Sequence, residues 1–408
     1  MQVNKQSFFS LLTYLAWLVL VVILVTVISC SPRDASSSAT EALLNKLPKT
    51  HTEEVSVEHA KNFSVSYHGN YKVVDLHFES QGRGMNFRQK LVLVQRGTEA
   101  PQKSGALANA WFMDIPVATM AANHDGEVIR VKSLGLIDHI AGMGGGDIYD
   151  PELRERWEQK KIASIGYSFH AVPSPELLMS AGAEMLALHT YDNTRLDGMN
   201  KLRELGINAI PHFAWAEQTY LGKAEWVKFS ALFFNKEAEA NQLFEKIRER
   251  CESLINKVAQ LKEKKSTFLL YFPSDEAEWK AHRNDFYASY LQAVSHNVLK
   301  DDGPTHSVGM NNEQLLALAR DADFWMINST TDEDWPPASY LKSFKSYREG
   351  NVYHYQKRTN YEHNAYDWYE TPEVRPDLVL EDLVSIFYPE LLPDHEPIFF
   401  EKVKLTKQ

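Results

Sequence analysis

The chain has 408 residues, of which 44% are hydrophobic, 24% charged and 12% aromatic. This composition is typical of a globular protein with a large buried core, and it excludes a disordered or fibrous chain. The formal charge is −11 and no run of Lys or Arg is long enough to follow a phosphate backbone, so we expect no nucleic-acid partner. Two cysteines are too few for a disulfide framework or a four-thiolate zinc site.

The first thirty residues have the pattern of an export signal. Lys5 gives a positive start, and the stretch from Phe8 to Ile28 is almost wholly apolar, which by length alone would also suit a membrane helix. The stretch ends in Val27-Ile28-Ser29-Cys30, which resembles the bacterial lipobox. We therefore expect a lipoprotein signal peptide over residues 1–29 and a periplasmic protein anchored to a membrane through lipidated Cys30. An uncleaved signal anchor is the alternative.

The chain after Cys30 is expected to begin with a flexible tether over residues 30–58, because residues 31–40 (SPRDASSSAT) are small and polar. Residues 62–78 then alternate apolar and polar side chains on both sides of His68-Gly69-Asn70. This pattern predicts an N-terminal β-hairpin with a glycine turn, and residues 90–95 predict a third strand.

From residue 116 onward, short apolar runs alternate with helical stretches. The expected helices in the first half are 127–136, 175–183 and 196–205, and the alternation resumes at residue 266. Strands that alternate with helices imply parallel pairing and an α/β architecture. Residues 223–265 contain no Pro or Gly and carry apolar residues at helical spacing, which predicts a helix of about forty residues, with a break near Asn235 left open.

The predicted fold is therefore α/β, with two three-layer lobes whose parallel central sheets are joined by one long rigid helix. The N-terminal lobe covers residues 59–222 with its leading hairpin, the inter-lobe helix 223–265, the C-terminal lobe 266–370 and a helical tail 371–408. Two lobes with one rigid connector enclose a cleft. Cys251 lies on the apolar stripe of the connector and is expected to be buried.

Five segments share their order and spacing with a known family. They are residues 134–144 (LGLIDHIAGMG), 174–188 (SPELLMSAGAEMLAL), 202–229 (LRELGINAIPHFAWAEQTYLGKAEWVKF), 312–327 (NEQLLALARDADFWMI) and 373–395 (EVRPDLVLEDLVSIFYPELLPDH). Together they resemble the periplasmic binding proteins of iron-complex and cobalamin uptake, the class with a helical backbone between its lobes. The added hairpin and tail are similar to lipoproteins of Bacteroidota. The resemblance implies a siderophore, haem or corrinoid ligand and delivery to an ABC permease.

Ligand groups in parallel α/β lobes come from the loops after the carboxyl ends of the strands. Those loops hold Asn123, His124, Tyr167, Phe169, His170, Tyr191 and Trp215 in the first lobe, and Tyr271, Trp279, His306, Tyr353, His354 and Arg358 in the second. The set is aromatic and rich in imidazoles, which suits a flat or bulky ligand. We expect an iron-siderophore or a corrinoid rather than haem or a bare metal ion.

The segment from Tyr361 to Tyr369 holds four aromatic rings in nine residues. It is predicted either to cover the rim of the cleft as a flap or to pack as a separate cluster under a loop.

The resemblance also implies one docking carboxylate per lobe for the permease, and the matching positions are Glu176 and Glu313. Each is expected in the first turn of its helix, where Ser174 or Asn311 could cap. The helix dipole favours a carboxylate at such a position without any partner, so a purely structural role is the alternative.

No catalytic residue, resident cofactor or dedicated metal site is predicted. The chain has no HExxH pair, no GxSxG turn and no P-loop, and Gly144-Gly145-Gly146 lacks the order of a dinucleotide site. The expected protein is a monomeric, non-enzymatic binding component of an ABC importer. Haem or metal-ion binding by the same fold is the first alternative, with His124, His170 and His354 as candidate ligands, and a secreted hydrolase is the second.

Overall fold

The computed structural model describes residues 32–79, 85–166, 172–271, 279–303, 307–332 and 335–406. The chain divides into two compact units, 1–47 and 48–408. None of the helices in the described ranges is long and apolar enough to cross a bilayer. The apolar stretch from Phe8 to Ile28, together with Cys30, lies outside these ranges.

The first unit contains the helix α2 (Pro32–Leu44). The predicted flexible tether over residues 30–58 is therefore wrong for this part of the chain. Pro32 stands in the first turn, where proline fits a helix, and Ala35, Ala39 and Ala42 favour helix strongly. The end of the predicted tether belongs to the second unit, in which Val55 is buried.

The second unit begins with a four-stranded sheet of β1 (Phe63–His68), β2 (Tyr71–Glu79), β3 (Asn86–Gln95) and β4 (Trp111–Ile115). The first three strands are antiparallel and β4 runs parallel to β3. Gly69 turns between β1 and β2 at a φ of 68°, a value that costs glycine little. The predicted hairpin and third strand are confirmed, whereas β4 was not predicted.

Two buried carboxylates of the later chain hold the segment that leads into this sheet. Glu225 accepts hydrogen bonds from the backbone N–H groups of Glu58, His59 and Ala60 at 2.7–3.1 Å. Glu217 accepts from the next backbone N–H groups, which are those of Lys61 and Asn62. Because a buried backbone donor must find a partner, these carboxylates fix an otherwise irregular segment.

The first lobe is built on a five-stranded sheet in the order β7-β6-β5-β8-β9 in which every pair is parallel. Its strands are β5 (Met120–Ala122), β6 (Ile140–Met143), β7 (Ala163–Ser164), β8 (Met185–His189) and β9 (Asn208–His212), and its helices are α3 (Asp125–Ser133), α4 (Pro151–Glu158), α5 (Pro175–Ala181) and α6 (Asn193–Glu204). Three short 3-10 turns also belong here, Gly105–Leu107, Ile137–His139 and Ala214–Ala216. Strands β5 and β8 are buried along their whole length, as expected for a sheet covered on both faces.

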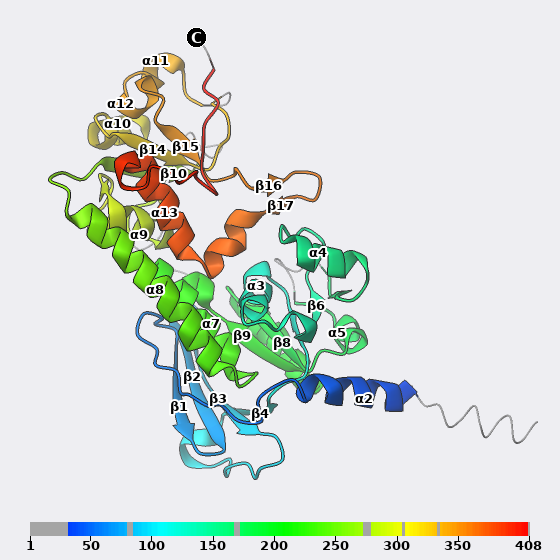
Figure 1. The fold of residues 1–408 in the computed structure, drawn as a ribbon. Coiled ribbons are helices and arrows are strands. Elements are labelled where there is room, and N and C mark those ends of the chain that lie inside the picture. Colours follow the sequence, from blue (N-terminus) through cyan, green and yellow to red (C-terminus); the bar gives the residue numbers. More distant parts are fainter. Residues whose placement is uncertain are drawn as a thin grey trace, which may run out of the picture. The chain divides into compact units, whose positions relative to one another are not determined.

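The predicted inter-lobe helix over residues 223–265 is two helices, α7 (Tyr220–Leu232) and α8 (Glu237–Ala259). The break lies at Asn235, the position that the sequence left open, where φ is 55°. Helices α7 and α8 pack against each other, and α8 alone is the long connector, about 34 Å at 1.5 Å per residue. Figure 1 shows α13 (Pro376–Phe387) lying along α8. Cys251 is buried on α8, as predicted.

The second lobe contains a seven-stranded sheet in the order β13-β11-β10-β14-β15-β18, with β12 beside β10. Its strands are β10 (Ser266–Tyr271), β11 (Trp279–Ala281), β12 (His296–Asn297), β13 (Val308–Met310), β14 (Phe324–Ile327), β15 (Val352–His354) and β18 (Glu401–Lys402). Its helices are α9 (Phe286–Val294), α10 (Asn312–Ala319), α11 (Ala338–Leu341) and α12 (Lys345–Arg348), and the 3-10 turn Pro389–Leu391 follows α13.

This sheet is mixed, because β11 and β18 run antiparallel to their neighbours. Only seven residues separate β10 from β11, which is too short for the crossover that a parallel pair needs. The all-parallel expectation is therefore correct for the first lobe only. A small hairpin, β16 (Thr359–Asn360) and β17 (Ala365–Tyr366), precedes the 3-10 turns Asp367–Tyr369 and Thr371–Glu373.

Candidate functional site

Two neighbouring cavities lie where the first lobe meets the segment that follows β15, and together we call them the cleft. The first cavity has a volume of about 380 Å³ and the second about 390 Å³. His124 and Tyr369 line both cavities. The other residues of the first cavity are Asn123, Asp125, Gly144, Gly145, Asp147, Asn364 and Tyr366, and those of the second are Glu127, His189, Tyr191, Ala214, Trp215, Lys223, Phe286, Tyr287 and Glu373.

The strand order of the first lobe explains why these residues converge. Strand β5 lies between β6 and β8, so the chain first extends the sheet to one side and then returns to the other. Such a switch point leaves a crevice at the carboxyl ends of the two strands, and ligands of open α/β sheets bind there. Asn123 and His124 follow β5 and His189 ends β8, so all three lie at this crevice. The amide oxygen of Asn123 accepts from the backbone N–H of His189 at 2.7 Å and joins the two strand ends.

Glu127, in the first turn of α3, lies beside three imidazoles. Its Oε2 atom is 3.4 Å from Nδ1 of His124, and its Oε1 atom is 3.1 Å from Nδ1 of His212 and 3.9 Å from Nδ1 of His189. The rings of His124 and His189 stack with their centroids 4.3 Å apart and their planes 9° apart. His124 also caps α3, because its Nδ1 accepts from the backbone N–H of Gly126.

The charges of this group depend on one another. Burial alone would raise the pKa of Glu127, but His212 and His124 outweigh burial and hold the pKa well below its usual range. Burial would lower the pKa of His124, and Glu127 reverses that effect and raises it. Burial lowers the pKa of His189 to about 4 and that of His212 to about 3. At neutral pH the last two are therefore neutral imidazoles beside a carboxylate.

Glu373 brings a second buried carboxylate to the cleft from the segment before α13. It pairs with Lys223 of α7 and with Arg130 of α3, whose Nη2 atom is 2.5 Å away. Burial would raise the pKa of Glu373, but these two cations outweigh it and hold the pKa at about 2. Glu373 is thus an ionised group fixed between the elements of the first lobe and the later chain.

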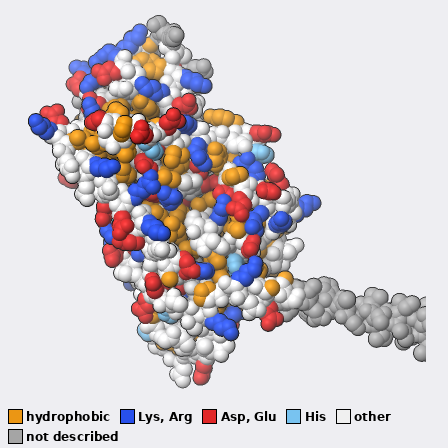
Figure 2. Space-filling view, in the orientation of Figure 1, with side chains coloured by type: hydrophobic (Ala, Val, Ile, Leu, Met, Phe, Trp, Pro, Cys, Tyr) orange, Lys and Arg blue, Asp and Glu red, His pale blue; other side chains and the backbone are white. Residues whose placement is uncertain are grey.

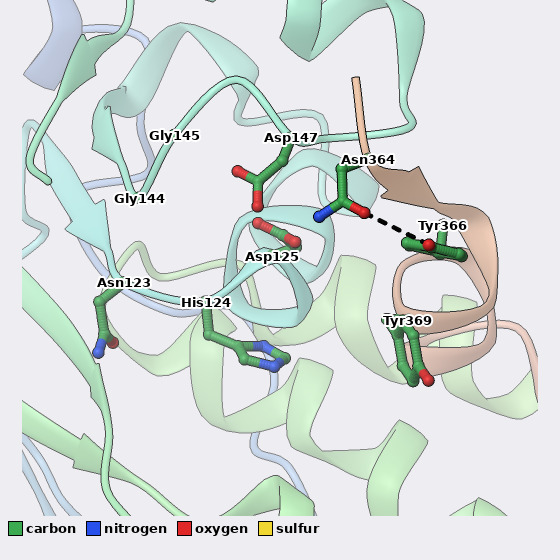
Figure 3. A pocket seen from close by; sticks show the side chains of 9 residues that line it. All are labelled: Asn123, His124, Asp125, Gly144, Gly145, Asp147, Asn364, Tyr366 and Tyr369. Carbon is green, nitrogen blue, oxygen red and sulfur yellow. Dashed lines mark hydrogen bonds between the residues drawn. The ribbon is translucent and has the colours of Figure 1, made fainter. Parts of the chain in front are cut away.

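The side of the first cavity opposite His124 is built by the β16–β17 hairpin and the turn after it. Figure 3 shows Asn364, Tyr366 and Tyr369 on one side and Asn123, His124 and Asp125 on the other. Arg358 holds this part of the chain in place, because its guanidinium pairs with Asp367 at 2.6 Å and lies over the ring of Tyr149. The predicted aromatic flap at residues 361–369 therefore contributes to the wall of the cleft.

Four of the candidate residues from the sequence line the cleft: Asn123, His124, Tyr191 and Trp215. Tyr271 does not line the cleft, and its ring lies against His282 and Tyr287. Arg358 does not line the cleft either, but its ion pair with Asp367 holds the neighbouring segment in place. Tyr353 and His354 lie in β15 and pack against other parts of the second lobe, where Gln356 N–H donates to His354 Nδ1. Tyr167, Phe169, His170 and His306 lie outside the described residues.

The prediction for Trp279 is wrong. Its side chain is 0% exposed, packs against Trp325 and Trp335 and donates to Asn312 Oδ1 at 2.9 Å. The sequence placed this residue in a loop, but it belongs to β11, whose alternation turns Trp279 into the core of the second lobe.

Four residues of the cleft were not predicted from the sequence: Glu127, His189, Lys223 and Glu373. Glu127 follows His124 at i+3 on a helix, a spacing that brings two side chains together, and His189 ends the strand whose loop was already chosen for Tyr191. These two had a local signal. Lys223 and Glu373 had none, because they are 150 residues apart along the chain and meet only through the packing of the connector.

The buried carboxyl group of Glu370 is expected to make the stability of the protein depend on pH. It accepts hydrogen bonds from the backbone N–H groups of Tyr149 and Asp150, yet burial raises its pKa from 4.5 to about 8. Between these values the folded protein binds a proton that the unfolded chain does not, so this group's contribution to the free energy of unfolding falls as the pH rises from about 5 to 8.

We expect Glu370→Gln to remove this contribution, so that the variant gains stability relative to the natural protein as the pH rises through the same window. Urea unfolding at pH 5 and pH 8 measures the difference. Parallel pH dependences for the two proteins would contradict the assignment.

No family model matches this chain. Two uncharacterized lipoproteins of Methanocaldococcus jannaschii are similar to it in sequence. One is 24% identical over 335 residues, which are 78% of this chain and 77% of the relative. The other is 22% identical over 329 residues, which are 77% of this chain and 80% of the relative.

Solved structures with a similar fold include a periplasmic binding protein from Veillonella parvula, with a TM-score of 0.54 and 14% identity over 77% of this chain and 98% of that one. A periplasmic heme-binding protein from Roseiflexus in apo form has a TM-score of 0.51 and 14% identity over 66% of this chain and 98% of its own. CeuE of Helicobacter pylori with Ni(II) bound has a TM-score of 0.51 and 13% identity over 69% and 87%. These likenesses show the fold, which is that of the two-lobed periplasmic binding proteins with a helical connector.

Proposed function

We propose that this chain is the lipid-anchored, extracytoplasmic substrate-binding component of an ABC importer and that it captures a metal-containing ligand, an iron-siderophore or a corrinoid, without turnover. The observation that carries this proposal is the cleft itself: its two cavities share His124 from the switch point of the first lobe and Tyr369 from the later chain. A ligand that fills the cleft would touch both parts of the chain, as capture between two lobes requires. We assign the lobes to residues 59–222 and 266–370.

The chemistry of the lining supports this ligand class. Tyr191, Trp215, Phe286, Tyr287 and Tyr369 present aromatic surface, and His124 and His189 add imidazoles. Aromatic rings cover the face of a chelate or macrocycle with little loss of side-chain entropy, and imidazoles can bind iron. Haem is the second candidate because the same groups suit it and because one similar fold is a heme-binding protein.

A ligand titration tests the proposal. Trp215 lines the second cavity, so its intrinsic fluorescence should change when a ligand enters the cleft. We expect one ligand among ferric siderophores, cyanocobalamin and haemin to give a saturable change with unaltered ligand recovered afterwards. Recovery of a chemically altered ligand would instead support a hydrolase.

Membrane attachment is proposed to occur through Cys30. Replacing Cys30 by Ser should leave the signal uncleaved and remove the acyl chains, because the lipid is attached through the thiol that serine lacks. Mass spectrometry of the membrane fraction should find a diacylated Cys30 at the start of the natural protein. An intact peptide that spans Lys5 to Cys30 in mature material would contradict this assignment.

The docking surface on the permease is proposed to include Glu176 and Glu313. Both side chains are exposed, each in the first turn of its helix, capped by Ser174 in α5 and by Asn311 in α10. Exposed apolar side chains accompany them on the same helices, Leu177 and Met179 on α5 and Leu318 on α10. The face seen in Figure 2 carries acidic and basic side chains interspersed with one another.

A further inference from the structure

We propose that His124, Glu127 and His189 form a binding site for one divalent first-row transition-metal ion. This inference rests on the proposed function and narrows its ligand class: the metal would be held directly by the first lobe. Its chelator would therefore have to leave at least three coordination positions open or exchangeable. A corrinoid or haem offers only two axial positions, so the inference favours a low-denticity chelate or the ion itself.

The first support is the geometry of the donor atoms. One ligand atom from each of the three residues lies within 4.8 Å of the other two. Ions of this class bind nitrogen and oxygen at about 2.0–2.2 Å, so ligands of one ion lie about 3–4 Å apart. One pair is already at that spacing, because Oε2 of Glu127 lies 3.4 Å from Nδ1 of His124; for an ion to use this nitrogen, it would replace the hydrogen bond from Gly126 N–H.

The second support is a buried acceptor that lacks a hydrogen bond. The side chain of Glu127 is 3% exposed, and its Oε2 atom accepts no hydrogen bond from the residues that the structure describes. A buried carboxylate oxygen that accepts no hydrogen bond is costly, even with an imidazole nitrogen 3.4 Å away. A cation between Glu127 and the two stacked imidazoles would satisfy it.

The surroundings have the features of an outer shell. His212 lies 3.1 Å from Oε1 of Glu127, and Arg130 lies 3.9 Å from the same atom. Groups of this kind fix the orientation of a ligating carboxylate and tune its charge. His124 is held in place because its side chain caps α3 by accepting from Gly126 N–H. The hydrogen bond from His189 N–H to the side chain of Asn123 fixes the end of β8.

The open side of the site faces the cleft. Glu127 and His189 line the second cavity and His124 lines both, so the remaining coordination positions would point to the space where a chelator can sit. Two imidazoles and one carboxylate are the ligand set of first-row metals, whereas Ca²⁺ and Mg²⁺ prefer oxygen ligands only. The expected order of affinity is Co²⁺ below Ni²⁺, and the site should reject Mg²⁺.

The test is metal titration of the full-length protein in detergent, prepared without a polyhistidine tag and stripped with a chelator. Calorimetry with NiCl₂ alone should give one equivalent of tight binding, and CoCl₂ should give a visible absorption spectrum of a nitrogen- and oxygen-ligated ion. His124→Asn keeps a helix-capping side chain and His189→Gln keeps a polar one, and each should weaken Ni²⁺ binding at least tenfold and alter the Co²⁺ spectrum. His354→Gln, at a histidine of β15 that lines neither cavity, is the matched control and should change neither.

Three outcomes would overturn the inference: no stoichiometric Ni²⁺ or Co²⁺ binding by the natural protein, undiminished binding by both His124→Asn and His189→Gln, or an equal loss in His354→Gln. Its failure can be separated from failure of the proposed function. If Ni²⁺ and Co²⁺ do not bind but ferric siderophore or haemin does, the metal site is wrong and the binding protein stands. If neither metal nor any chelate binds, both are wrong.

Discussion

Replacing Glu225 by Ala is expected to lower the free energy of unfolding by about 3–5 kcal/mol. The carboxylate is fully buried and accepts from the backbone N–H groups of residues 58–60. It also pairs with Lys228 at 2.8 Å, whose side chain is 9% exposed. Burial alone would raise the pKa of Glu225, but Lys228 and the backbone donors outweigh burial and lower it, so the group is ionised and its charge is compensated.

The loss is large because the substitution removes one acceptor from several groups at once, among them the buried N–H of Ala60, although the Lys228 ammonium keeps its hydrogen bond to Ser56 O at 2.7 Å. Three backbone donors and one ammonium group would lose the same acceptor, and an unmet buried group costs more than the net value of the bond it made. Chemical denaturation gives the measurement. Glu239→Ala is the control, since Glu239 in the first turn of α8 pairs at the surface with Lys236, the residue before that helix, and its loss should cost less than about 1 kcal/mol. A similar cost for the two variants would show that residues 58–60 are not anchored through Glu225.

The double substitution of Glu176 and Glu313 by Ala should abolish ligand uptake while ligand affinity and thermal stability stay nearly unchanged. Both side chains are exposed, so their removal exposes no core. The helix caps are Ser174 and Asn311, which remain in the variant, and Gln314 completes the capping box of α10. Exposed ion pairs are worth about 0–1 kcal/mol each, so the two glutamates would act on the orientation and the rate of docking.

Uptake in cells and permease binding in vitro measure this effect. The control is the double variant Glu204→Ala and Asp321→Ala, which removes one exposed carboxylate from each lobe outside the two docking helices. We expect normal uptake in the control. Normal uptake in the Glu176 and Glu313 variant, or a large loss of its stability, would show that these residues serve their helices and nothing more.

The fold was predictable from the sequence because its signals are local. The short strands that alternate with helices, the glycine turn at Gly69 and the lack of Pro and Gly in residues 223–265 can each be recognised from residues that are close together in the sequence. The errors arose where tertiary packing decides. Asn235 takes a left-handed conformation and turns the predicted single helix back on itself as α7 and α8.

The candidate site was predictable where its residues follow the carboxyl ends of parallel strands. Loops after β5, β8 and β9 gave His124, Tyr191 and Trp215, all of which line the cleft. The rule failed in the second lobe, where β11 is antiparallel and carries Trp279 into the core. It also could not find Glu373, which reaches the cleft from a turn before α13 through pairing with Arg130 and Lys223.

The most direct test of the central claim, capture of a ligand in the cleft, compares two tyrosines of the same segment. Tyr369 is 43% exposed and lines both cavities, whereas Tyr361 is 70% exposed and lines neither of them. The ligand identified by titration should bind Tyr369→Ala at least tenfold more weakly than the natural protein and should bind Tyr361→Ala with unchanged affinity. Equal affinity for all three proteins would contradict the claim that the cleft is the binding site.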